Sequence, residues 1–107
     1  MHAARHLKPM NKTFIPHSFP VQEAALIKLL GHPIRLRILT ALNEKNHSVK
    51  GLWEQLDLKQ SVVSQHLAIL KNHDIIVGNR CGVRMYYQIQ HHLAQRIITA
   101  ISRSATN

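Results

Sequence analysis

The sequence predicts one mainly α-helical domain that also contains a β-hairpin, an α+β fold class. Apolar residues recur at helical spacing from Val21 to about Leu70. The period then changes to short β-branched and aromatic runs on either side of a glycine turn. Helical spacing returns from His91. The chain has 107 residues, which is enough for one domain with a modest core.

Residues 1–20 differ in composition from the rest of the chain. They contain three of the four prolines, several basic side chains and histidines, and no acidic residue. We expect an extended basic arm that is ordered only when it docks on another surface. The folded domain is then expected at residues 21–103, followed by a short tail at residues 104–107.

The first half of the domain is predicted to form three helices. The first begins near Val21 and ends at Gly31, a residue typical of helix C-termini. Pro33 suits the first turn of a second helix, where its missing N–H costs nothing. A polar loop is expected at residues 43–47. Ser48 is then the predicted N-cap of a short third helix.

A tight turn and a fourth helix follow. Asp57 stands where a turn between helices needs a residue that tolerates positive φ. Ser61 is expected to cap the fourth helix. Its inner side carries Val63, Leu67 and Leu70 at helical spacing.

The remaining elements are a hairpin and a last helix. Residues 75–77 and 85–89 are predicted strands because they are rich in β-branched and aromatic side chains. Residues 80–83 are the predicted turn, with Gly82 at positive φ. The last helix is expected from His91 to about Arg103.

Net charge indicates the class of partner. Fourteen Lys and Arg face five Asp and Glu, which gives +9 with neutral histidines. Such a surplus favours a polyanion, with nucleic acid as the first candidate and a membrane surface as the second. No apolar run reaches the roughly 18 residues of a membrane span. A single cysteine and a start without a signal-peptide pattern lead us to expect a cytoplasmic protein without a membrane partner.

The order helix, turn, helix, hairpin indicates a DNA-reading unit. In such units the second helix lies in the major groove, so its exposed end must be polar and not acidic. A basic hairpin beside it reaches phosphates or the minor groove. We expect base contacts from the polar residues of the fourth helix and mainly phosphate contacts from the basic ones. The predicted DNA-binding residues are Lys59, Gln60, Ser61, Ser64, Gln65, Arg80 and Arg84.

Three segments together carry a family resemblance. The runs LGHPIRLRIL (30–39), LKQSVVSQHLAILK (58–71) and NRCGVRMYYQI (79–89) resemble the ArsR/SmtB family of winged helix-turn-helix repressors. The resemblance covers about residues 21–102 and implies a homodimer on an inverted-repeat DNA operator. The protomers would pair through the first and last helices, and the apolar stripe of the last helix is consistent with this. The predicted dimer interface is Val21, Leu26, Leu93, Ile97, Ile98 and Ile101.

The same resemblance implies that the family's metal sites are lost. The first cysteine of the third-helix site corresponds here to Ser48. The four ligands of the last-helix site correspond to Gln90, His92, Arg103 and Thr106, of which only His92 is able to ligate zinc. We therefore expect a repressor without a bound metal or other cofactor, and no inducer is evident.

Other hypotheses remain open. A sensor repressor could respond to metal through the arm histidines His2 and His6, or to oxidants through Cys81 beside Arg80 and Arg84. A non-specific basic nucleic-acid binder, or a membrane-surface binder, is the alternative from another class. An enzyme is not expected, because the five carboxylates are scattered and no nucleophile motif is present. We expect a structural hydrogen bond from His66 and a packing role for Trp53.

Overall fold

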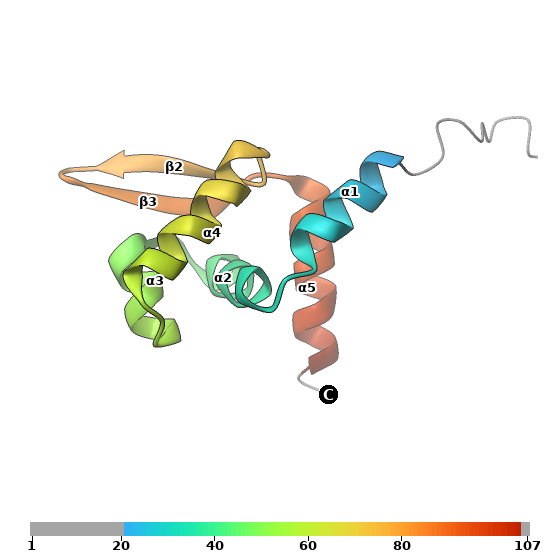
Figure 1. Cartoon of the computed structure of the whole chain (residues 1–107), viewed down its shortest axis with the longest axis horizontal. Coiled ribbons are helices and arrows are strands. Elements are labelled where there is room, and N and C mark those ends of the chain that lie inside the picture. Colours follow the sequence, from blue (N-terminus) through green and yellow to red (C-terminus); the bar gives the residue numbers. More distant parts are fainter. Residues whose placement is uncertain (1–20, 106–107) are drawn as a thin grey trace, which may run out of the picture.

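The computed structural model describes residues 21–105, and the predicted basic arm with His2 and His6 lies outside these residues, as does Thr106. Five helices and a three-stranded sheet form the domain, so the predicted fold class is confirmed (Figure 1). The elements are α1 (Val21–Leu30), α2 (Pro33–Glu44), β1 (His47–Ser48), α3 (Val49–Leu56), α4 (Gln60–Asn72), β2 (Ile76–Cys81), β3 (Arg84–Ile89) and α5 (His92–Ala105). None of the helices in residues 21–105 is long and apolar enough to cross a membrane.

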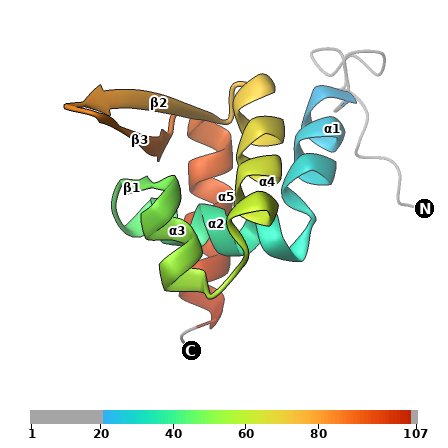
Figure 2. The same cartoon turned by 60° about the vertical axis from the view of Figure 1, so that its left-hand side comes forward.

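Helix α2 supplies the centre of the core. Ile38 and Leu39 are completely buried, and Leu42 is nearly so. The other helices bring their own buried side chains to this centre, including Leu52 from α3 and Ile98 from α5. In Figure 2, α3 and α4 lie in front of α2, and the hairpin of β2 and β3 projects away from the helices. The apolar core therefore holds the projecting polar elements in one arrangement.

Four local sequence signals act as predicted. Pro33 is the first residue of α2. The Ser48 hydroxyl caps α3 by accepting a 3.0 Å hydrogen bond from the Gly51 N–H. Asp57 adopts the left-handed conformation with φ 55°, and Gly82 has φ 65° in the hairpin turn. Each of these residues acts through its own backbone or first neighbours, which explains why sequence alone identifies them.

The prediction that Ser61 caps α4 is wrong. The helix begins two residues earlier than a Ser61 cap requires, at Gln60, and its N-cap is Lys59, which makes no side-chain capping bond. Ser61 lies inside the first turn with an exposed side chain. The serine therefore does not cap the helix, and its side chain faces solvent.

The sheet is larger than predicted. His47 and Ser48, expected at the end of a loop, form β1 and pair antiparallel with Tyr87 and Tyr86 of β3. Pairing of β2 with β3 continues to Cys81 and Arg84, so only two residues remain in the turn instead of four. Sequence could not show this pairing because β1 is too short to carry a strand pattern of its own.

The last helix starts one residue later than predicted. His91 precedes α5, and its Nδ1 accepts a 3.2 Å hydrogen bond from the Ala94 N–H. The helix continues to Ala105, beyond the predicted end at Arg103. His91 therefore caps α5 instead of lying within it.

The left-handed residue between α3 and α4 generates a stability prediction. Replacing Asp57 with Val should destabilise the domain by about 1–2 kcal/mol, because a β-branched side chain clashes with the backbone at positive φ. Urea unfolding at neutral pH measures the loss. Asp57→Gly is the matched control and should retain at least wild-type stability. Equal stabilities of the two variants would contradict this account of the turn.

Candidate nucleic-acid interface

Helix α4 has two chemically distinct faces. Val63, Leu67 and Leu70 are buried against the core, as predicted. The opposite face carries the predicted base-contacting residues, all of which are exposed: Gln60, Ser61, Ser64 and Gln65. Lys59 is also exposed just before the helix. The structure thus brings the five predicted contacts of this helix to one surface.

The segments that form α4 and the hairpin contain no acidic residue. No Asp or Glu occurs between Asp57 and Asp74, and none follows Asp74. The N-terminus of α4 also carries the partial positive charge of a helix dipole. No side chain caps this end, so the first backbone N–H groups of α4 have no side-chain acceptor. The side chains of α4 itself, from Gln60 to Asn72, are therefore all basic or neutral.

The hairpin adds a second basic element. Arg80 lies in β2 and Arg84 opens β3, and both side chains are exposed. Val83 at the tip is 91% exposed. In both views the hairpin projects from the side of the domain that carries α3 and α4 (Figures 1 and 2). A basic β-ribbon beside a polar helix end is suited to reach a second stretch of DNA backbone.

A cluster of three side chains fixes the middle of α4. Arg35 donates through Nε to the Leu29 carbonyl at 2.6 Å, and its Nη1 lies 3.3 Å from Nδ1 of His66. An arginine is always a donor, so Nδ1 of His66 accepts and its imidazole is neutral. The His32 ring lies 4.5 Å from the His66 ring, and its Nδ1 accepts from the Ile34 N–H. This cluster joins α1, α2 and α4, and the expected structural role of His66 is confirmed.

Arg37 performs a similar task for α3. Its Nη2 donates to the carbonyl of Leu56, the last residue of α3, at 2.6 Å. The final carbonyls of a helix have no partner within the helix, so a guanidinium there satisfies an acceptor and opposes the helix dipole. The sequence alone predicted no role for Arg35 or Arg37. Their roles depend on neighbouring helix ends, and no local signal reveals these ends as partners.

Two histidines resist protonation. Burial, followed by the neighbouring His32 and Arg35, lowers the pKa of His66. Burial, followed by Lys45, lowers the pKa of His47. His47 is only 6% exposed, and its Nε2 has no hydrogen-bond partner. Acid must therefore introduce charge into packed parts of the domain.

Comparison with known proteins places these features in a family. Residues 32–77 match the model of the bacterial regulatory proteins of the arsR family. The chain is 35% identical over 81 residues to the transcriptional repressor PagR of Bacillus anthracis. The aligned region covers 75% of this chain and 81% of PagR. The chain belongs to the ArsR family of bacterial regulatory proteins. This family is regulatory and not enzymatic.

A second ArsR-family relative is longer than this chain. The chain is 35% identical over 80 residues to the HTH-type transcriptional repressor SmtB of Mycobacterium tuberculosis. The match covers 74% of this chain but 59% of SmtB, so the chain spans less than two thirds of that relative.

Solved structures agree with the winged helix-turn-helix fold. A "predicted DNA-binding transcriptional regulator" from E. coli superposes with a TM-score of 0.79 at 31% identity, covering 83% of this chain and 95% of that one. The homodimeric winged helix-turn-helix DNA-binding domain Mb0332 of Mycobacterium bovis gives a TM-score of 0.71. At 24% identity over 85% of this chain and 84% of that one, Mb0332 supports the fold alone.

Two of the positions that correspond to ArsR-family metal ligands lie within the described residues at the starts of helices. The Ser48 hydroxyl is engaged in capping α3. His92 is exposed at the first residue of α5. Within residues 21–105, no three His, Cys, Asp or Glu side chains are grouped to hold a metal ion. A regulator without a resident metal stays a prediction.

The lowered pKa of His66 generates a prediction about acid stability. The unfolded chain takes up a proton near pH 6.5, whereas the folded state resists it. The free energy of unfolding should therefore be unaffected by this group above pH 6.5 and fall as pH drops below that value. His66→Gln should show a smaller loss than wild type between about pH 7 and 5, measured by urea unfolding. His92→Gln, which removes an exposed imidazole, is the matched control, and equal losses in both variants would contradict the assignment.

Proposed function

We propose that this ArsR-family chain is a sequence-specific DNA-binding repressor that acts as a homodimer on an inverted-repeat operator, without a resident metal. The observation that carries the proposal is the exposed polar face of α4, free of acidic side chains and flanked by the basic hairpin. Gln and Ser side chains are able to donate to and accept from base edges in the major groove. The relatives SmtB and PagR are repressors by name. The proposal places the protein in the cytoplasm, with its DNA.

Exposed apolar side chains support the dimer. Among the described residues, Val21 and Ile27 on α1 are 72% and 59% exposed. Leu93 and Ile101 on α5 are 37% and 43% exposed. Exposed apolar surface on two terminal helices is typical of a subunit interface. Ile27 was not part of the predicted interface, although it is more exposed than the predicted members Leu93 and Ile101.

Two predicted interface residues take another role. Leu26 is 7% exposed and Ile98 is completely buried within the protomer. Both are therefore core residues of the protomer. They were predicted at the interface because helical periodicity does not distinguish the face of α1 or α5 that packs on its own core from the face that packs on a partner. The proposed interface keeps Val21, Leu93, Ile101 and the partly buried Ile97.

A matched pair of substitutions separates backbone from base contacts. Arg84→Ala should weaken binding to operator and random duplexes alike and reduce the slope of log K against log salt by about one unit, because one phosphate contact is lost. Gln65→Ala should cost about 1–3 kcal/mol on the operator and little on random DNA. Fluorescence anisotropy at several salt concentrations measures both. Equal weakening of both duplexes by Gln65→Ala would contradict its role as a base reader.

The dimer generates its own prediction. Ile101→Glu places a charge in the proposed apolar interface while the side chain is exposed in the protomer. Sedimentation equilibrium should show a dimer for wild type and mainly monomer for the variant, with circular dichroism unchanged. Val83→Glu, which alters the exposed tip of the hairpin, is the control and should remain dimeric. A dimeric Ile101→Glu protein would exclude Ile101 from the interface.

A further inference from the structure

A cavity lies between α3, the start of α4 and the hairpin. Its volume is about 360 Å³, within the usual range for small-molecule sites. Val49, Trp53 and Met85 form its apolar lining, and all three side chains are partly buried. The rim carries Lys50 from α3, Gln60 from α4 and Arg84 from β3. Three elements that are separate in sequence thus line one hollow, which is open to solvent.

The cavity combines an apolar floor with a positive rim. Lys50 and Arg84 come from different elements, and the uncapped N-terminus of α4 adds partial positive charge at Gln60. None of the cavity-lining residues is acidic. The ligand that matches such a surface has a hydrocarbon or aromatic body and one anionic group.

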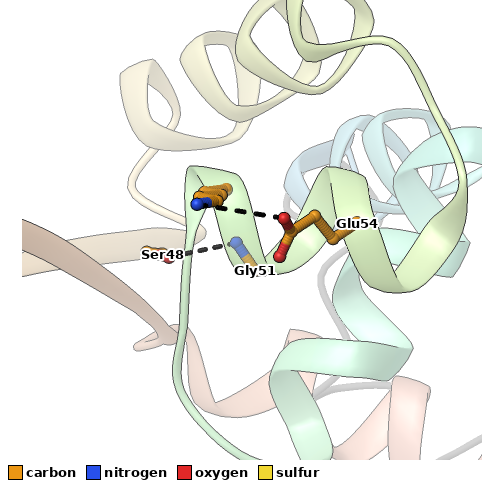
Figure 3. Close-up of polar contacts among 4 residues, drawn as sticks. Ser48, Gly51 and Glu54 are labelled. Atoms are coloured by element: carbon orange, nitrogen blue, oxygen red, sulfur yellow. Dashed lines mark hydrogen bonds and ion pairs between the residues drawn. The ribbon is translucent and has the colours of Figure 1, made fainter.

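Glu54, next to Trp53 in the sequence, is an acidic residue that pairs loosely with the rim. Its carboxylate lies 4.0 Å from the Lys50 ammonium, one turn along α3 (Figure 3). Both side chains are 55% exposed, and an exposed pair at this distance contributes little. The Lys50 ammonium is therefore able to leave Glu54 for a ligand carboxylate.

We propose that this cavity binds a small organic carboxylate with an apolar body, and that the bound carboxylate releases the protein from DNA. The release step rests on the proposed function, because Gln60 and Arg84 line the cavity and are also proposed DNA contacts. A ligand carboxylate held by Arg84 competes directly with a DNA phosphate. This binding would supply the inducer that the sequence did not reveal.

A DNA strand is the other occupant to distinguish. Its phosphates would satisfy Lys50 and Arg84 equally well. The apolar floor favours the carboxylate ligand, because its hydrocarbon or aromatic body packs against the Trp53 indole and the Met85 thioether. A DNA backbone would offer these two side chains only the edges of its deoxyribose rings. Trp53 is the chain's single tryptophan, so its fluorescence reports occupancy of the cavity without a label.

The first experiment titrates the full-length protein with 3-phenylpropionate and with octanoate, and follows Trp53 fluorescence. We expect saturable changes with dissociation constants of about 1 mM or below, as suits ligands of this size. The uncharged 3-phenylpropan-1-ol should bind at least about tenfold more weakly, because it lacks the carboxylate. Absence of saturation with both acids, or equal affinity for the alcohol, would overturn the proposal.

Variants and DNA complete the test. Lys50→Ala should weaken carboxylate binding about fivefold or more, whereas Lys28→Ala, on the exposed side of α1, should leave it unchanged. Equal affinities of these two variants would overturn the assignment of the rim. The acids should also raise the concentration of protein needed to half-saturate DNA, and unchanged DNA affinity would overturn the release step. Carboxylate binding by a protein that binds no DNA would support the cavity while refuting the proposed function.

Discussion

Arg35 contacts α1 and α4 from its place on α2, and the orientation of α4, the helix proposed to contact DNA, depends on this junction. Its guanidinium satisfies a carbonyl in the last turn of α1 and holds the neutral imidazole of His66 in the middle of α4. A hydrogen bond to a charged donor contributes about 1.5–3 kcal/mol, a large share of the stability of a small domain. Arg37 fixes the end of α3 in the same way. The two arginines, with the buried face of α2 between them, hold α3 and α4, whose outer ends are proposed to face DNA.

This arrangement explains how a small basic domain stays folded and remains suited to bind a polyanion. The positive charges that serve folding, Arg35 and Arg37, are paired with carbonyls at helix ends. Those proposed to serve binding, Lys59 before α4 and Arg80 and Arg84 on the hairpin, are all exposed. His47 and His66, which burial keeps neutral, add no further repulsion near neutral pH. One set of basic residues thus stabilises the fold, and a separate set is proposed to contact DNA.

The sequence predicted those parts of the structure that depend on local chemistry. Pro33, Ser48, Asp57 and Gly82 each act within a few residues, and the inner face of α4 follows from helical spacing alone. The strand β1 was missed because its two residues acquire strand geometry only by pairing with Tyr86 and Tyr87. The roles of Arg35 and Arg37 and the cavity beside Trp53 were missed for a related reason. Each requires partners that folding brings together from separate elements.

The central claim is that the surface formed by α4 and the hairpin reads a specific DNA sequence. The most direct measurement is a fluorescence anisotropy titration of the wild-type protein, at fixed salt, against a duplex from upstream of its own gene and a shuffled duplex of equal length. We expect binding to the upstream duplex at least about a thousandfold tighter than to the shuffled one. Equal affinity for the two duplexes, falling steeply together with added salt, would contradict the claim and indicate a non-specific binder.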